Sequence, residues 1–323
     1  MSDKPIQVEQ KAAEQVPAPP HPRERREPLP GQAARRPAED QAQREAVARL
    51  VASPSYREAD ADLDFIQSPV VRGPRLELEY LKAETLLREH NIAHTVVVFG
   101  GTRVLPHPHA VQSVAGCRTK LDADPDNPVL RKALAVAERV LEKCRYYEMA
   151  REFGRIVGHA GDRGRNGRIV IMTGGGPGIM EAANRGSYEA GARTVGLNIT
   201  LPHEQLPNPY ITPELCLRFH YFALRKLHFA LRARALVVFP GGYGTLDELF
   251  EFLTLSQTRK MAPIPIVLAC QDYWRKVFNP EFLVDEGMID AEDHELFWFA
   301  ESAEQIWSGI LDWYEKRGEP LLV

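Results

Sequence analysis

The chain has 323 residues, of which 44% are hydrophobic and 26% charged, as is ordinary for a globular protein with a sizeable core. A formal net charge of −4 gives no overall attraction to nucleic acid or anionic membranes, so we expect neither as a partner. The four cysteines are widely spaced and predict reduced thiols. The sequence shows no signal peptide and no apolar run of membrane length, and we therefore expect a cytoplasmic protein.

The first ninety residues differ in composition from the remainder. Residues 1–40 are rich in Pro, Gln, Glu, Arg and Ala and have few large apolar side chains, which predicts a disordered tail. The alternative is a partner-binding arm of polyproline II character. Residues 41–90 have helical apolar spacing and predict an N-terminal helical segment, followed by a separate domain over 91–323.

From residue 91 onward, short apolar strands alternate with helices. This order predicts an α/β fold with a Rossmann-like, doubly wound parallel sheet and helices on both faces. The expected strands are 95–99, 168–173, 194–199, 235–239 and 263–269. We expect a long helical region at about 127–157, a helix that ends near 190, and helices over 221–233, 245–258, 272–284 and 303–316. On helix 221–233 we expect Leu224, Leu227 and Leu231 to form the buried side.

Three of the expected strands end in glycine-rich turns. Because ligands of such sheets bind beyond the carboxyl ends of the strands, we expect these turns to converge on one crevice. A glycine turn that enters a helix offers backbone N–H groups at the positive end of the helix dipole, which suits a phosphate. The alternative is that the glycines serve only tight turns and close packing. The residues concerned are Gly100, Gly101, Gly174, Gly175, Gly176, Gly178, Gly241, Gly242, Tyr243, Gly244 and Thr245.

The spacing of these glycines narrows the class of ligand. The G-x-x-x-x-G-K-[ST] pattern of P-loop NTPases is absent. The turn that begins at Gly174 has the spacing G-x-G-x-G, and no carboxylate ends the next strand, so NAD is weakly supported. A mononucleotide or a phosphorylated sugar is the better expectation.

The stretch from Pro240 to Glu248 has two interpretations that the sequence leaves equal. Thr245 and Glu248 have the spacing of a capping box, in which the glutamate bonds to a backbone amide. Alternatively, Glu248 is a catalytic carboxylate beside the phosphate site. Upstream, Arg225 and Lys226 lie on a helix that precedes the last glycine turn, where Arg225 could meet the phosphate or belong to a solvated basic face.

These motifs together resemble the LOG (Lonely Guy) family of nucleoside 5′-monophosphate phosphoribohydrolases. Pro240–Glu248 meets its P-G-G-x-G-T-x-x-E pattern, Arg225 and Lys226 its Arg-Lys pair, and Gly174–Met180 its glycine-triplet turn. The resemblance covers about residues 92–272. An N-terminal extension and an insert around 104–130 depart from the short plant-type members and resemble the larger bacterial branch.

The resemblance implies both a site and a reaction. It makes Arg225 and Glu248 the catalytic pair, and it places the glycine turns and Lys226 in substrate binding. The implied N-glycosidase is of the AMP nucleosidase type and cleaves AMP or an N6-modified AMP, such as a cytokinin riboside monophosphate, to free base and ribose 5-phosphate. It implies no metal, no cofactor and a homodimer or larger homo-oligomer.

Two other functions stay open: a non-catalytic nucleotide sensor and a molybdenum-cofactor carrier. Lysine decarboxylation is disfavoured because it requires a Schiff-base lysine, and neither Lys226 nor Lys260 has an obvious partner for the cofactor's pyridinium nitrogen.

Overall fold

The structure is a computed structural model that describes residues 19, 21–25, 27, 41–164, 168–201 and 206–322. The prediction of a disordered tail over 1–40 lies almost wholly outside the described residues. The chain divides into two compact units, 1–68 and 69–323. The described helices of the first unit are α1 (Gln41–Val51) and α2 (Leu63–Gln67), and neither has a buried residue.

Helix α3 (Arg72–Glu89) belongs to the second unit. It buries Ala83 and Leu87 and contacts the first strand of the sheet. Glu84 accepts hydrogen bonds at 2.7 and 2.8 Å from the Arg232 guanidinium, whose Nε also donates to the carbonyl of Ile92 at 3.0 Å. The compact domain therefore begins before residue 91, because this helix is bound to the sheet by both apolar and ionic contacts.

The second unit is built on a seven-stranded parallel sheet of order β4-β3-β2-β1-β5-β6-β7, which confirms the predicted fold class. The strands are β1 (Ile92–Phe99), β2 (Arg168–Thr173), β3 (Thr194–Ile199), β4 (Cys216–Phe219), β5 (Ala233–Val238), β6 (Ile266–Ala269) and β7 (Trp298–Ala300). The sequence prediction missed β4 and β7, the two edge strands, because runs this short carry little periodic signal.

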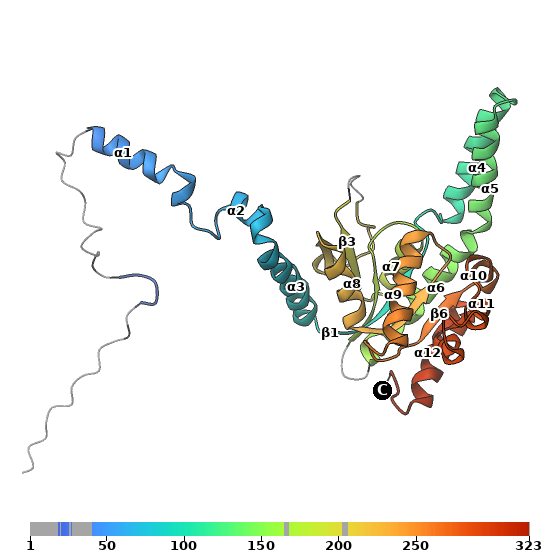
Figure 1. Ribbon diagram of the computed structural model, residues 1–323. Coiled ribbons are helices and arrows are strands. Elements are labelled where there is room, and N and C mark those ends of the chain that lie inside the picture. The colour runs from blue at the N-terminus through green and yellow to red at the C-terminus, as the bar shows by residue number, and fades with distance from the viewer. Residues whose placement is uncertain are drawn as a thin grey trace, which may run out of the picture. The chain divides into compact units, whose positions relative to one another are not determined.

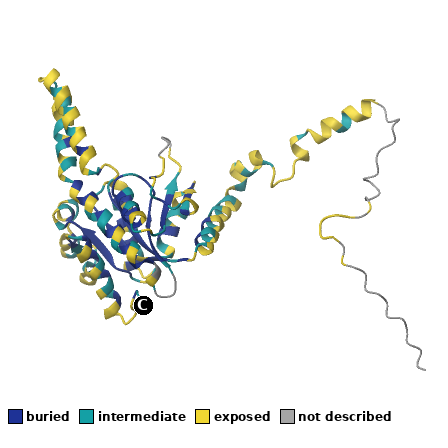
Figure 2. Cartoon of the chain, turned by 180° about the vertical axis from the view of Figure 1, so that it is seen from behind, coloured by how far each residue is buried: buried dark blue, intermediate teal, exposed yellow. Residues whose placement is uncertain are grey.

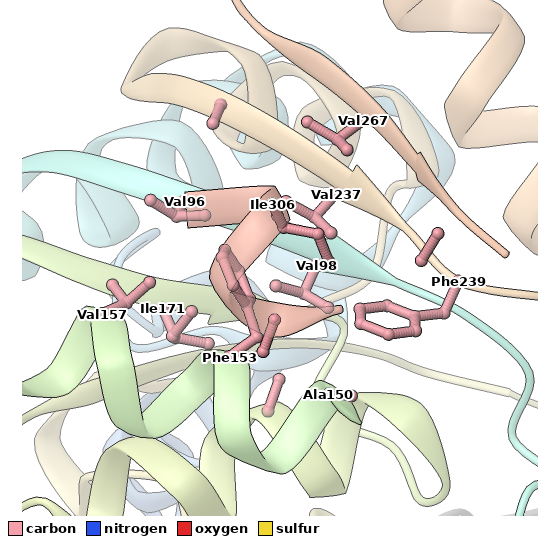
Figure 3. Close-up of a cluster of buried hydrophobic side chains, with 14 of the residues drawn as sticks. Val96, Val98, Ala150, Phe153, Val157, Ile171, Val237, Phe239, Val267 and Ile306 are labelled. Carbon is pink, nitrogen blue, oxygen red and sulfur yellow. The ribbon is translucent and has the colours of Figure 1, made fainter. Parts of the chain in front are cut away.

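Alternate residues of the central strands β1, β2, β5 and β6 enter two separate cores. On one face, Val96 and Val98 of β1 pack with α6 (Cys144–Ala160), α7 (Ile179–Glu189) and α12 (Ala303–Lys316), as Figure 3 shows for part of this cluster. On the other face, Val97 and Phe99 join residues of the helices α3, α8 (Phe222–Leu231), α9 (Tyr243–Gln257) and α10 (Gln271–Val277). Burial on both faces explains why these four strands are mostly apolar.

Two sequence predictions about helices are wrong. The helix expected over 272–284 is divided into α10 and α11 (Pro280–Asp285), because Asn279 caps a new helix with Pro280 in its first turn. On α8, Leu227 and Leu231 are 41% and 48% exposed rather than buried. The buried residues of α8 are His228 and Phe229, so the face that meets the sheet is offset from the leucine stripe.

The helical region predicted over 127–157 consists of two helices, α5 (Pro128–Glu142) and α6, with Lys143 between them. Helix α4 (His107–Ala123) occupies the insert and forms a hairpin with α5 that projects from the sheet domain (Figure 1). The hairpin is mostly exposed or half-buried (Figure 2). Asn127 caps α5 by accepting from the amides of Val129 and Leu130 at 3.0 and 3.3 Å.

The topology defines one place for a ligand. From β1 the chain adds β2, β3 and β4 on one side, and then returns to add β5, β6 and β7 on the other. The direction therefore reverses between β1 and β5, and the carboxyl ends of these strands flank the crevice where such sheets bind ligands. Within the described part of the chain, no helix combines the length and apolar character needed to cross a membrane.

Candidate active site

The three glycine turns meet through backbone hydrogen bonds. The amide of Gly101, after β1, donates to the carbonyl of Pro240, after β5, at 2.9 Å. The amide of Ile179, after β2, donates to the carbonyl of Gly101 at 3.2 Å. The turns that follow β2, β1 and β5 are therefore joined in sheet order.

Close approach explains why two of these positions require glycine. Gly178 has a φ of 75°, and a Cβ there would overlap the carbonyl oxygen of Gly101 and lie 2.8 Å from Cα of Thr102. A Cβ on Gly174 would lie 2.5 Å from Nη2 of Arg225 and 2.9 Å from Sδ of Met180. Packing of the turns against one another therefore accounts for part of the glycine pattern, as one interpretation of the sequence had it.

A cavity of about 740 Å³ opens at the carboxyl ends of β1 and β5. Its volume lies within the range common for small-molecule sites. The turn after β5, the turn after β1, and helices α5, α8 and α9 all contribute to its lining. Of the residues singled out from the sequence, the cavity is lined by Gly100, Gly101, Arg225, Gly241, Gly242, Tyr243, Gly244, Thr245 and Glu248.

The glycine turn after β2 contacts other parts of the protein rather than the cavity. Asn208 forms two hydrogen bonds with this turn: its backbone amide donates to the carbonyl of Gly175 at 2.9 Å, and its side-chain Nδ2 donates to the carbonyl of Gly176 at 3.1 Å. Gly174, Gly175, Gly176 and Gly178 are not among the residues that line the cavity, although Gly174 backs the Arg225 side chain.

Lys226 also lies outside the cavity lining. Its ammonium group pairs with Asp247 at 2.9 Å and with Glu251 at 3.1 Å, both on α9. The pair of basic residues on α8 is thus divided between two tasks. Arg225 lines the cavity, whereas Lys226 joins α8 to α9 from the side.

Arg225 is held in place by three contacts. Its Nε donates to the carbonyl of Leu197 at 2.8 Å, and its guanidinium carbon lies 5.8 and 5.3 Å from the ring centroids of Phe222 and Phe229. Burial lowers the pKa of Arg225 and nearby Glu248 opposes this effect. Because an arginine retains its proton in proteins, the group is a fixed cation at the cavity wall.

Glu248 is the unusual group of the cavity. It is only 4% exposed, and its Oε2 has no hydrogen-bond partner among the described residues. Burial raises the pKa of Glu248 to about 7, although the charges of Lys226 and Arg225 act in the opposite direction. A buried carboxyl with a free oxygen and a pKa near neutrality is suited to exchange a proton or to face a developing positive charge.

The geometry of α9 excludes the capping box. The helix begins at Tyr243, its N-cap is Gly242, and no side chain caps it. Thr245 already lies in the first turn, where its amide donates to the carbonyl of Gly242 at 3.0 Å. Glu248 is therefore inside the helix, where it lines the cavity and does not form a capping box with Thr245.

The N-terminus of α9 has the features of an anion site. Gly241, Gly242 and Gly244 leave the backbone accessible beside the half of the helix dipole that attracts negative charge. The carbonyl of Gly241 accepts a hydrogen bond at 2.5 Å from the hydroxyl of Tyr273, which supports the turn from α10. Thr245 is 6% exposed and lies beside this turn.

Sequence reasoning missed one whole wall of the cavity. Val136, Arg139, Val140 and Lys143 on or just after α5 line it, together with Arg103 from the loop after β1. Their spacing of three and four residues is a helical stripe, but nothing in the sequence says which neighbour such a stripe meets. Phe222, Asp247 and Tyr273 were also missed.

Comparisons with known proteins agree on the central part of the chain. The family described as "Possible lysine decarboxylase" matches residues 180–310. A "Probable cytokinin riboside 5′-monophosphate phosphoribohydrolase" of Oryza sativa subsp. japonica is 26% identical over 140 residues, which is 42% of this chain and 60% of the relative. A cytokinin riboside 5′-monophosphate phosphoribohydrolase of Arabidopsis thaliana is 28% identical over 144 residues, 43% of this chain and 64% of the relative. The chain thus spans less than two thirds of the length of either relative.

Solved structures show more distant likenesses. The X-ray structure of TM1055 is 18% identical, covers 67% of this chain and 98% of its own, and has a TM-score of 0.39. The molybdenum cofactor carrier protein of Chlamydomonas reinhardtii is 18% identical, with coverages of 69% and 98% and a TM-score of 0.38. TM-scores this low carry no argument about a ligand.

Proposed function

We propose that this chain, whose central part is similar to cytokinin riboside 5′-monophosphate phosphoribohydrolases, hydrolyses the N-glycosidic bond of a nucleoside 5′-monophosphate to free base and ribose 5-phosphate. The observation that carries the proposal is the carboxyl group of Glu248, buried and with one oxygen unpartnered, in the same cavity as Arg225 and the N-terminus of α9. AMP and N6-modified AMP are the proposed substrates.

In this proposal the 5′-phosphate binds at the N-terminus of α9. The backbone of Gly241–Gly244 and the hydroxyl of Thr245 receive it, and the guanidinium of Arg225 offers a fixed positive charge from α8. Binding at this non-reacting end of the substrate would hold the ribose in position for cleavage, so that binding energy serves the chemical step.

Glu248 then acts at the sugar. When the bond between C1′ and the base nitrogen breaks, positive charge develops on the ribose, and the ionised carboxylate stabilises that charge. The same carboxylate can take a proton from the water that attacks C1′, and this proton can then pass to the nitrogen of the departing base, so that Glu248 is ionised again. With a pKa of about 7, Glu248 is partly ionised at neutral pH, as both roles require.

The test is incubation of the full chain with AMP, an N6-modified AMP, adenosine and a nucleoside monophosphate of another base, read by chromatography. Release of free base and ribose 5-phosphate from the monophosphates, with adenosine barely cleaved, is the expected result. Comparable rates on AMP and adenosine would contradict the phosphate site. Binding of AMP without release of base would indicate a nucleotide-binding protein instead.

We further propose that the protein forms a homo-oligomer with a dimer as its minimum unit. Leu227 and Leu231, separated by one turn of α8, are large apolar side chains exposed to solvent, as is Phe250 of α9 at 40%. A second copy could cover them. Light scattering at micromolar concentration should detect at least a dimer, and a monomer would refute the proposal.

A further inference from the structure

The α5 wall of the cavity carries a stripe of alternating apolar and cationic residues. Val136, Arg139, Val140 and Lys143 lie three or four positions apart, so they share one side of the helix, and all of them line the cavity. Arg103, two residues after Gly101, lines the same space. This wall therefore presents cations but no carboxylate to a ligand in the cavity.

The three cations that line the cavity differ from two arginines of the hairpin, which form ion pairs within the described part of the chain. Arg118 pairs with Glu138 at 2.9 Å, and Arg131 pairs with Asp126 at 3.2 Å. Within the part of the chain that the structure describes, no ion pair or side-chain hydrogen bond is formed by Arg103, Arg139 or Lys143. Gathering like charges without a counter-ion is unfavourable, so an anionic ligand would stabilise this wall.

The carboxylates elsewhere in the cavity do not compensate for the positive charges of Arg103, Arg139 and Lys143. Its two carboxylates are Asp247, which pairs with Lys226 at 2.9 Å, and Glu248, which is buried on α9. The N-terminus of α9 and Arg225 already provide for one phosphate. The cations of the α5 wall therefore exceed what a single phosphate group requires.

The position of this wall is set by the core of the domain. Lys143 is both the last capping residue of α5 and the residue that precedes α6, so no flexible loop separates the two helices. Three and four residues after it, Tyr146 and Tyr147 are buried in the core. The backbone at the base of the hairpin is thereby fixed, which keeps the side chains of Arg139 and Lys143 within reach of the cavity.

We propose that Arg103, Arg139 and Lys143 form a second anion subsite, and that the ligand is a nucleotide with an anionic group in addition to its 5′-phosphate. The inference rests on the proposed function for the identity of the first phosphate. The second group is a phosphate on the ribose, a further phosphate of the 5′ chain, or a carboxylate on the base. All three share the chemistry that arginine and lysine recognise.

The experiment measures dissociation constants by calorimetry on the full chain. The ligands are AMP, adenosine 3′,5′-bisphosphate, ADP and AMP with a dicarboxyethyl group on N6, which distinguish the three sources of the second anion. At least one of the last three should bind about tenfold more tightly than AMP, the gain expected when one more charge-assisted contact forms. In Arg139→Gln and Lys143→Gln this ratio of affinities should fall toward one.

Lys120→Gln is the matched control, because Lys120 is an exposed cation of α4 outside the cavity lining, and the ratio should be unchanged. The proposal is overturned if no second anion improves binding, if the two α5 variants keep the wild-type ratio, or if they change the oligomeric state by light scattering. Affinity is read separately from base release. A preference for the second anion without cleavage would therefore reject the proposed hydrolysis alone, and cleavage without that preference would reject this subsite alone.

Discussion

The two walls of the cavity are built in opposite ways. The wall of glycine turns uses backbone groups, is packed closely enough that a single methyl group would overlap the neighbouring turn at Gly178, and contains the buried Glu248. The α5 wall uses long side chains on a hairpin that buries little more than Ala110 of α4 and Ala137 of α5. A binding surface made of backbone tolerates almost no change, whereas one made of side chains on an exposed helix can change at small cost to stability.

The sharpest contrast should come from Gly178→Ala. The new Cβ would overlap the carbonyl of Gly101 at a φ of 75°, so both steric overlap and backbone strain oppose it. We expect a loss of about 3 kcal/mol in the free energy of unfolding, or more, measured by urea denaturation. Gly287→Ala is the control, because Gly287 has a φ of 69° but nothing within 4 Å, and it should cost only about 1 kcal/mol. Equal losses would show that strain alone, and not the contact between turns, demands glycine.

The next effect separates chemistry from binding. Glu248→Gln keeps the size of the side chain but removes its charge and basicity, so turnover of AMP should fall about 10²-fold or more. AMP affinity should survive, because Thr245 and the glycine amides remain. Arg225→Ala should weaken affinity as well as turnover, since a positive partner of the phosphate is lost. A folded Glu248→Gln protein with near-normal turnover would end the catalytic assignment.

A smaller effect should appear in the pH dependence of stability. The pKa of Glu248 is raised from its usual 4.5 to about 7 in the folded state, so the folded protein holds this proton more tightly than the unfolded chain does. The stability that this group contributes is present below about pH 4.5 and is lost as the pH rises through about 7. Glutamine does not titrate, so Glu248→Gln removes this loss of stability with rising pH. Relative to the wild type, the variant should gain about 2 kcal/mol between pH 5 and pH 8, measured by denaturation at each pH. If the difference in free energy of unfolding between the variant and the wild type stays constant over this pH range, the raised pKa of Glu248 is contradicted.

The smallest effect belongs to the hairpin. Gly116 lies in α4, and a Cβ there would meet nothing within 4 Å. Gly116→Ala should therefore stabilise the protein by about 0.5–1 kcal/mol, because alanine loses less backbone entropy in a helix. A loss of stability in thermal denaturation would show that the hairpin face at Gly116 is covered, for example by a second copy of the chain.

The wall of turns could largely be read from the sequence. Glycine marks positions where the backbone has a positive φ or approaches another backbone, and both requirements leave a local pattern. The same pattern, following apolar strands, indicated the parallel sheet and the convergence of Gly101 and Gly241 on one crevice. The residue pair Arg225 and Glu248 was found as well, and both line the cavity.

The tertiary structure alone decided the rest. Thr245 and Glu248 have capping-box spacing, but the helix begins at Tyr243, so the box does not form. Leu227 looked buried and is exposed, because the sheet meets another face of α8. The stripe of Arg139 and Lys143 became a wall of the site only through the fold. Local sequence determines backbone conformation and periodicity, whereas the neighbour that each helix face meets depends on contacts between residues far apart in the chain.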